Sequence, residues 1–192
     1  MERNVGKGHR LAVFASGNGS NFEAIAAACA DGRLDARVVL LVCDRPGAYV
    51  CERAARLGVE TFAFRPKDYV SKEAYEQDIV RMLDERGVEL VCLAGYMRIL
   101  SRVMLDAYGG RIVNIHPSLL PAFKGAHAIR DAFEYGVKVH YVNDELDGGK
   151  IIAQRAFDYT GADVQELEAM VHAVEHPLYV EAIAGLLAGR NR

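Results

Sequence analysis

The chain has 192 residues, which is the length of one ordinary domain with a full hydrophobic core. Half of the residues are apolar (51%) and a quarter are charged (26%), as in soluble globular proteins, and no apolar run reaches membrane-spanning length. The formal net charge of −3 gives no general attraction to nucleic acid or to acidic membranes.

The first residues and the cysteines bear on organisation and location. Residues 1–10 are polar and basic and lack the apolar core of a secretory signal, so we interpret them as a flexible leader before a single domain over 11–192. The cysteines form no CxxC pair, and three fall in apolar runs; they are Cys29, Cys43, Cys51 and Cys92. Buried thiols in a reducing compartment are favoured over disulfides or a metal site, and we expect a cytoplasmic protein.

Strand-like and helical patterns alternate along the first part of the chain. Apolar runs predict strands over 11–15, 36–43, 60–64, 90–94 and 111–115, and helical spacing predicts helices over 22–29, 49–57, 71–86 and 101–108. Because strands that are apolar on both faces alternate with helices, we expect a parallel sheet covered on both sides. Ligands bind at the carboxyl ends of the strands in such sheets.

A glycine-rich turn, Ser16–Asn21, joins the first predicted strand to the first helix. Free backbone N–H groups and the helix dipole favour a phosphate at such a helix N-terminus. The turn is neither a P-loop nor a full dinucleotide-binding motif, because Phe22 stands where the third glycine would be. For that reason Asp44, after the second strand, is not favoured as a ribose ligand of NAD. The alternative is that Ser20 and Asn21 simply cap the helix.

The segment from Arg111 to Gly125 brings an amide and an imidazole to the end of a strand. Asn114 and His116 are two residues apart, so they project from the same face, and Pro117 ends the strand. An amide donor beside a proton-transferring imidazole is typical of acyl transfer. The alternative is a turn residue beside an ordinary histidine. The expected convergence with the glycine-rich turn and with Tyr96–Leu100 at one sheet edge favours the functional interpretation.

The second part of the chain is predicted to hold a helix over 128–135, ended by Gly136, and strands over 137–142 and 150–157. The polar loop 143–149 is short enough for a hairpin, so these two strands should be antiparallel. A carboxylate of this loop could reach His116 and orient its ring, or the loop could be a solvated turn. Asp163 with Glu166 resembles a capping box that opens a terminal helical region, interrupted at Pro177 and resuming through Leu187.

Several motifs in order resemble those of the glycinamide ribonucleotide formyltransferases. They are SGNGSN at Ser16–Asn21, AGYMRIL at Ala94–Leu100, NIHPSLLP at Asn114–Pro121, ELDGG at Glu145–Gly149 and EHPLY at Glu175–Tyr179. The resemblance runs from Leu11 to the last helix. It implies a formyltransferase fold, which is a Rossmann-like, doubly wound α/β fold with a mostly parallel sheet and an antiparallel C-terminal strand pair.

The resemblance also implies the reaction. A formyl group would pass from 10-formyltetrahydrofolate to the amine of glycinamide ribonucleotide in purine biosynthesis. The partners would be these small molecules and neither nucleic acid nor a membrane, and the protein would be a monomer or a homodimer. No metal is required, because no cluster of His, Cys and carboxylate residues has ligand spacing.

Site residues carry over one by one from the family motifs. The resemblance implies Asn114, His116 and Asp147 as the catalytic residues. The phosphate would lie against Gly19, Ser20 and Asn21, and Glu175 would bind the glycinamide or ribose end. The folate pocket would be lined by Lys72, Met97, Arg98, Ile99, Leu100, Asn114, His140, Asn143, Asp144, Glu145, Leu146 and Asp147.

The chain departs from the family between Gly136 and His140, where the family has a longer strand with a Thr-Gly-x-Thr-like segment. The segment is about five residues shorter here, and removing an odd number of residues from a strand reverses the faces of the side chains that follow. The short strand leaves a catalytically impaired folate- or nucleotide-binding module as one alternative to the transferase. A formyltetrahydrofolate hydrolase-like enzyme is the other, because the resemblance implies that it shares the Asn–His–Asp constellation. A methionyl-tRNA formyltransferase is not expected, since no residues remain for a nucleic-acid-binding domain.

Overall fold

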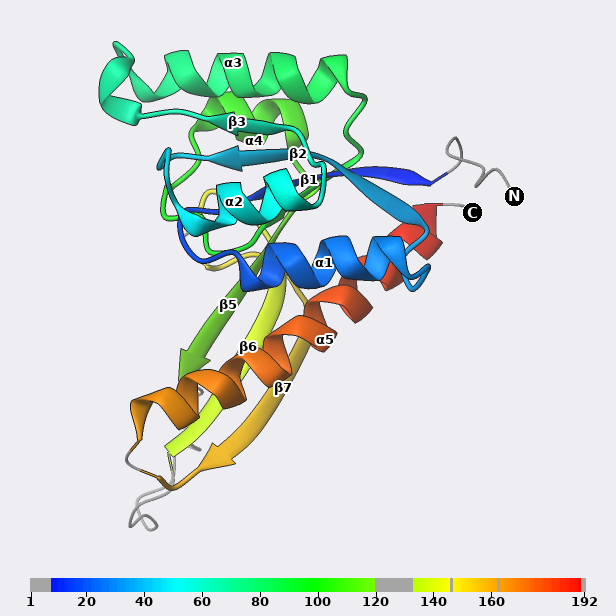
Figure 1. The fold of residues 1–192 in the computed structure, drawn as a ribbon, viewed down its shortest axis with the longest axis vertical. Coiled ribbons are helices and arrows are strands. Elements are labelled where there is room, and N and C mark those ends of the chain that lie inside the picture. The colour runs from blue at the N-terminus through cyan, green and yellow to red at the C-terminus, as the bar shows by residue number, and fades with distance from the viewer. Residues whose placement is uncertain (1–7, 120–132, 146, 162, 191–192) are drawn as a thin grey trace.

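A computed structural model describes residues 8–119, 133–145, 147–161 and 163–190. Its centre is a seven-stranded sheet in the order β3-β2-β1-β4-β5-β6-β7 (Figure 1). The strands are β1 (His9–Phe14), β2 (Ala36–Cys43), β3 (Thr61–Ala63), β4 (Leu90–Leu93), β5 (Ile112–Leu119), β6 (Phe133–Tyr141) and β7 (Ile151–Tyr159). The helices are α1 (Ser20–Ala30), α2 (Tyr49–Arg56), the short 3₁₀ helix η1 (Pro66–Asp68), α3 (Lys72–Glu85), α4 (Arg102–Tyr108) and α5 (Val164–Arg190).

The sheet is parallel from β3 to β5 and antiparallel from β5 to β7. The predicted doubly wound sheet with an antiparallel C-terminal pair is therefore confirmed. Alternate residues of β1 serve two separate cores, because side chains alternate across a strand. Leu11 and Val13 pack with α1, α2 and α5 on one face, while Ala12 and Phe14 pack with α3 and α4 on the other.

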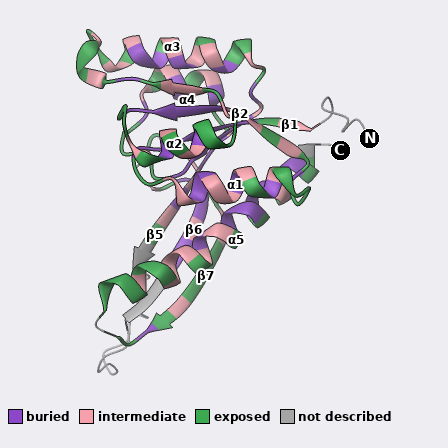
Figure 2. Ribbon diagram, viewed as in Figure 1, coloured by how far each residue is buried: buried purple, intermediate pink, exposed green. Residues whose placement is uncertain are grey.

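Burial follows this layering (Figure 2). The central strands β1 and β4 are buried along most of their length, whereas β7 at the sheet edge is mainly exposed. The far ends of β5, β6 and β7 project beyond the parallel part of the sheet together with the start of α5 (Figure 1). No described helix is both long and apolar enough to cross a membrane. All four cysteines are free thiols, and Cys43 and Cys92 are buried.

The predicted helix over 128–135 is wrong where it can be checked. Residues 128–132 lie outside the described part, but Phe133–Tyr135 are the first residues of β6, and Gly136 lies inside that strand rather than ending a helix. β6 pairs with β5 on one side and with β7 on the other along this stretch. Two ladders satisfy the backbone N–H and C=O groups, and such tertiary pairing outweighs local helical preference.

The C-terminal region also differs from the expectation. α5 runs without a break from Val164 to Arg190, with Pro177 inside it. Proline removes one helical hydrogen bond, but Leu178, Tyr179 and Ile183 beside it are buried against the sheet and hold the helix in place. The Asp163 carboxylate caps α5 by accepting from the N–H groups of Gln165 and Glu166. The expected reciprocal bond is absent, since the Asp163 N–H donates to the Tyr159 hydroxyl.

The start of the chain follows the prediction with a small shift. β1 begins at His9, so the last two residues of the proposed 1–10 leader belong to the sheet. Residues 1–7 lie outside the described part.

Candidate active site

Two adjoining cavities lie at the carboxyl ends of β1 and β4 and beside the middle of β5. The first, the loop cavity, has a volume of about 560 Å³ and lies between the Ser16–Asn21 turn and α5. The second, the histidine cavity, has a volume of about 610 Å³ and lies between the Tyr96–Leu100 segment, the middle of β5 and the polar loop after β6. The prediction that Pro117 ends its strand is wrong, because β5 continues to Leu119 and pairs with β6 along this stretch. The two cavities share Gly95, Met97, Ile115 and Pro117 as walls. One ligand could therefore meet another at this boundary.

The glycine-rich turn leaves the start of α1 uncapped by any side chain. The N-cap is Gly19, which has the left-handed φ of 80°, and it accepts the Glu23 N–H through its carbonyl at 3.0 Å. A β-carbon at this position would also overlap the Val50 side chain. The expected alternative, in which Ser20 or Asn21 caps the helix, is not what the structure contains. The first N–H groups of α1 therefore lack an intrahelical or capping partner and suit an anion.

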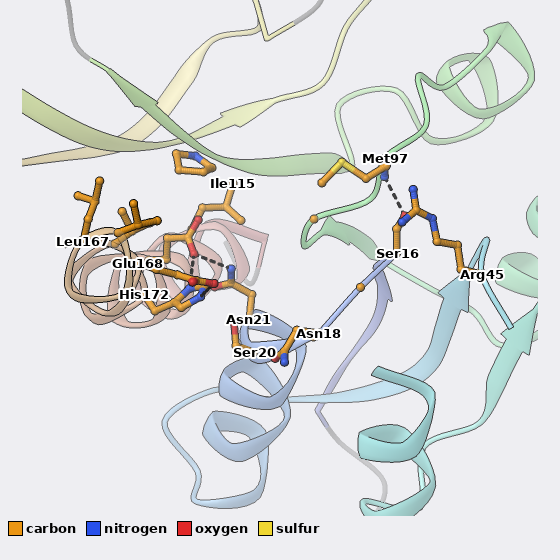
Figure 3. Close-up of a pocket in the computed structure, with 17 residues that line it drawn as sticks. Ser16, Asn18, Ser20, Asn21, Arg45, Met97, Ile115, Leu167, Glu168 and His172 are labelled. Carbon is orange, nitrogen blue, oxygen red and sulfur yellow. Dashed lines mark hydrogen bonds and ion pairs between the residues drawn. The ribbon is translucent and has the colours of Figure 1, made fainter. Parts of the chain in front are cut away.

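Neighbouring elements hold this turn in shape. From α2, Arg53 donates to the Asn18 carbonyl and to its side-chain oxygen, both at 2.9 Å, and forms an ion pair with Glu23. The Val50 N–H donates to the Gly17 carbonyl at 3.1 Å. On the other side, the Met97 N–H donates to Ser16 Oγ at 2.9 Å (Figure 3). The turn is thus preorganised and tied to the wall of the histidine cavity.

Acceptor groups gather at the α5 side of the loop cavity. Asn21 of α1 and His172 of α5 point toward one another (Figure 3), and both donate to Glu175 Oε2 at 3.1 Å. Glu175 is only 4% exposed, and the buried Oδ1 of Asn21 has no hydrogen-bond partner among the described residues. A cavity with uncapped N–H groups at one end and buried oxygen acceptors at the other matches a ligand with an anionic group and with hydroxyl or amino donors.

Four polar side chains meet in the histidine cavity. The Asp147 carboxylate accepts from Asn114 Nδ2 at 3.3 Å and lies 3.7 Å from His116 Nδ1 and 3.5 Å from His140 Nε2. Asn114 and His140 are directly opposite each other in the β5–β6 pair. His140 is 2% exposed, and its Nδ1 donates to the Tyr141 carbonyl at 2.8 Å, which orients the ring. His116 is the accessible histidine, with 39% of its side chain exposed.

Asp147 holds its place through an uncommon backbone conformation. Its φ of 51° is the only positive value among the described non-glycine residues. Its carbonyl accepts from Lys138 Nζ at 3.0 Å, and the next two residues are glycines. Left-handed conformations of this kind tend to occur at functional sites, and aspartate tolerates them better than most residues. The group as a whole combines an amide donor, an imidazole and an orienting carboxylate, which is the equipment of acyl transfer.

Comparison with known proteins identifies the family. The model of the family described as formyl transferase matches residues 9–183. The phosphoribosylglycinamide formyltransferase of Bacillus subtilis is 50% identical over 189 residues, covering 95% of this chain and 97% of the relative. The chain belongs to the formyl transferase family. The solved structure of glycinamide ribonucleotide transformylase 1 from Geobacillus kaustophilus is 51% identical, with a TM-score of 0.84 over 93% of this chain and 98% of its own.

A further relative shows the same unit inside a larger protein. The trifunctional purine biosynthetic protein adenosine-3 of Drosophila melanogaster is 38% identical over 94% of this chain but only 14% of its own length. The phosphoribosylglycinamide formyltransferase of Escherichia coli is 37% identical, covering 94% of this chain and 88% of the relative. The chain is thus similar both to a whole formyltransferase and to one part of a multifunctional protein.

The structure brings most of the residues expected from the formyl transferase motifs to the two cavities. The loop cavity contains Gly19, Ser20, Asn21 and Glu175. The histidine cavity is lined by Met97, Arg98, Ile99, Leu100, Asn114, His116, His140, Asn143, Asp144, Glu145 and Asp147. Leu146 lies outside the described residues. Lys72 does not line either one: its Nζ donates to the Ile99 carbonyl at 2.8 Å in a neighbouring outer cavity that shares Met97, Arg98 and Ile99.

The shortened strand does not turn His140 away from the site. β6 begins upstream at Phe133, and its pairing keeps His140 opposite Asn114. An irregularity in the β6–β7 register between Val139 and His140 accompanies this arrangement. The expected reversal of faces is therefore not seen at His140.

Two neighbours of the site were missed from the sequence. His172 was not singled out, although it lies three residues before Glu175 and thus one helical turn away. Ser16 was assigned to the turn without a role, and its contact with Met97 depends on two strands that are distant in sequence. Among the described residues, no group of three or more His, Cys, Asp or Glu side chains is arranged to hold a metal ion.

Proposed function

We propose that this chain transfers a formyl group from 10-formyltetrahydrofolate to the amine of glycinamide ribonucleotide, a step of purine biosynthesis. The observation that carries the proposal is the meeting of Asn114, His116 and Asp147 beside the boundary of two cavities. The relatives named for this reaction match nearly the whole chain. The folate donor supplies the formyl group. This chain supplies the side chains that orient the substrates and stabilise the developing negative charge.

In this proposal the loop cavity binds the ribonucleotide. The uncapped N–H groups at Gly19, Ser20 and Asn21 bind the phosphate, because backbone donors and the helix dipole both favour an anion. The buried Glu175 carboxylate accepts hydrogen bonds from the ribose or glycinamide end. The ligand is thus held by its two ends, with its amine directed to the shared wall.

The folate donor occupies the histidine cavity, against Met97, Arg98, Ile99, Leu100 and the 143–147 loop. Met97 and Ile99 are each 67% exposed, which is unusual for large apolar side chains and suits an apolar ring system. His140 and Asn143–Asp147 form the opposite wall, with Leu146 among them by sequence. Lys72 lies further out, toward the tail of the donor.

The catalytic residues stabilise the charge that develops on the formyl oxygen and help to move a proton from the amine. Asn114 Nδ2 and the protonated His116 ring stabilise the negative charge that develops on the formyl oxygen when the amine attacks. Asp147, whose carboxylate lies 3.7 Å from His116 Nδ1, orients the imidazole ring. The amine loses a proton and the folate nitrogen gains one, with His116 or a water carrying it. Buried His140 orients Asn114 from the other side, because Asn114 Nδ2 can donate to His140 Nε2 at 3.4 Å.

Domain organisation, cellular location and partners are part of the proposed function. The chain from His9 onward acts as one formyltransferase domain, in the cytoplasm, as a monomer or a homodimer. The partners are the two small molecules, and neither nucleic acid, membrane nor metal takes part.

One assay tests this function. The purified chain is given the 10-formyl donor with and without glycinamide ribonucleotide, and release of tetrahydrofolate is followed. Release that depends on the ribonucleotide supports the transferase. Equal release without it would instead indicate a hydrolase, and binding of both ligands without release would indicate an inert binding module.

A further inference from the structure

Asp44 is a buried acid that the proposed mechanism leaves without a role. It directly follows β2, where an acidic residue of a dinucleotide-binding sheet would meet a ribose. Here its side chain is fully buried, and its Oδ2 accepts from Arg98 Nε at 2.7 Å. The carboxylate is therefore engaged with the Tyr96–Leu100 segment that follows β4, and not with a ligand.

Among the described residues, only the Nε of the Arg98 guanidinium has a hydrogen-bond partner, which is Asp44. Its Nη groups donate to no group among the described residues, and 41% of its side chain is exposed. Arg98 borders both the histidine cavity and the outer cavity, the latter together with Lys72. Lys72 is already occupied with the Ile99 carbonyl. The ion pair thus leaves the outer edge of a guanidinium available to a ligand at the junction of the two cavities.

Stability does not explain this arrangement well. The second oxygen of Asp44, Oδ1, is buried without a hydrogen-bond partner among the described residues, and so is the Tyr96 hydroxyl. Burying an incompletely bonded carboxylate is unfavourable, and buried ion pairs are often no better for stability than apolar replacements. A carboxylate buried in so unfavourable a place is explained if it orients a group for binding.

We propose that Asp44 is a positioning residue that fixes Arg98 as the receptor for an anionic group of the molecule in the histidine cavity. This inference rests on the proposed function, in which that molecule is the folate donor. The anionic group is then the carboxylate-bearing glutamate tail of the donor. Lys72 contributes positive charge to the same outer cavity.

The test compares Asp44→Ala and Asp44→Asn with the wild-type chain. Asp44→Ala removes the partner of Arg98, and we expect a rise of about tenfold in KM for the donor, the size of one charge-assisted hydrogen bond. Asp44→Asn keeps an acceptor for Nε and should recover part of the affinity. In both variants kcat and the KM for the ribonucleotide should stay unchanged. The thermal midpoint should be unchanged or higher, since partly exposed Arg98 can turn to solvent.

A truncated donor separates positioning from a structural role. With a 10-formyl tetrahydropteroyl carboxamide, in which a neutral amide replaces the glutamate tail, the wild type should bind as weakly as Asp44→Ala, and the variants should show no further loss. Arg98→Lys, which cannot donate to Asp44 while also presenting a planar edge, should behave like Asp44→Ala. Glu60→Gln is the matched control, because it neutralises the partner of Arg86, an arginine that borders none of the three cavities.

Two results would overturn the inference: an unchanged donor KM in Asp44→Ala, or an equal loss with the full and the truncated donor. If Asp44→Ala fails to fold, Arg98→Lys with the two donors gives the same decision. If the wild type transfers no formyl group, the proposed function fails separately. Donor binding measured by calorimetry then still decides the role of Asp44.

Discussion

Asp147 shows how a single backbone angle organises the candidate site. Its left-handed conformation, with a φ of 51°, directs one carboxylate to three neighbours on β5 and β6. Asn114 and His116 come from the same strand, whereas His140 comes from its antiparallel partner. The chemistry of the site therefore depends on common side chains that act together because all of them lie beside the Asp147 carboxylate.

His116 provides the first prediction, at the scale of one side chain. His116→Ala should lower kcat by a factor on the order of a hundred or more, because a preplaced donor to the developing negative charge is lost. The KM for the ribonucleotide should change little, since His116 does not line the loop cavity. Steady-state kinetics with both substrates check this. His9→Ala, at a histidine that borders none of the cavities, is the control, and near-normal turnover in His116→Ala would reject the role.

Among the secondary-structure elements, the start of α1 depends most on one residue. Gly19→Ala should lower the free energy of unfolding by at least about 1 kcal/mol, because a left-handed φ is unfavourable for alanine. Its β-carbon would also overlap Val50, so the turn should shift and the KM for the ribonucleotide should rise. Urea unfolding and kinetics measure the two effects.

Gly17→Ala is the matched control for this element. A β-carbon there would meet no atom within 4 Å, so unfolding should be little changed. Equal stability of the Gly17 and Gly19 variants would show that the turn is not held as described.

α5 is anchored to the neighbouring strands β4 and β5. The buried Tyr179 hydroxyl bonds to the carbonyl of Leu93 at 2.9 Å, at the end of β4, and to that of Val113 at 3.1 Å, near the start of β5. Tyr179→Phe leaves both carbonyls short of a donor and should lower the free energy of unfolding by about 1–3 kcal/mol. Chemical denaturation tests this, with Tyr49→Phe on the exposed face of α2 as the control. A loss no greater than that of the control would contradict the anchoring role.

At the scale of the whole molecule, His176 links stability to pH. Burial, followed by the neighbouring His172, lowers its pKa below the ordinary value of 6.5. The unfolded chain therefore binds a proton at a higher pH than the folded chain does. Stability from this group is complete above about pH 6.5 and decreases as the pH falls toward the folded-state pKa. His176→Asn should accordingly flatten the decrease.

The measurement is the free energy of unfolding in urea between about pH 5 and pH 8, for the wild type and the variant. The difference between the two curves isolates this histidine from carboxylates whose pKa is also shifted, such as Glu60 beside Arg86. Parallel curves would show that His176 binds its proton equally well in both states.

Much of the fold could be predicted because the signals are local. The apolar runs of β1, β2 and β4 are short and buried on both faces, which reads directly as a parallel sheet. Ser71 and Ser101 are the first residues of two predicted helices, and they cap α3 and α4, since a cap needs only its own neighbours in sequence. The motifs around Asn114, His116 and Asp147 likewise indicate the chemistry, because they can be recognised in the sequence alone.

The failures occur where distant pairing overrules local preference. Phe133–Gly136 were assigned to a helix and its end, yet they enter β6, because β5 and β7 offer partners on both sides. Pro177 was expected to interrupt the last helix, yet packing on the sheet carries α5 through it. Neither the strand at Phe133–Gly136 nor the unbroken α5 can be predicted from those residues alone, because both depend on distant partners.

From its residues alone, this chain determines an alternating strand–helix order, an amide and an imidazole on the same face of one strand, and a glycine-rich turn before the first helix. Only the tertiary structure decides that Asp147 reaches both histidines, that Asn21 and His172 share Glu175, and that Asp44 turns inward to Arg98. The reason is physical: periodicity and capping act within a few residues, whereas Asn114 meets Asp147 across 33 positions of sequence and Asn21 meets Glu175 across 154.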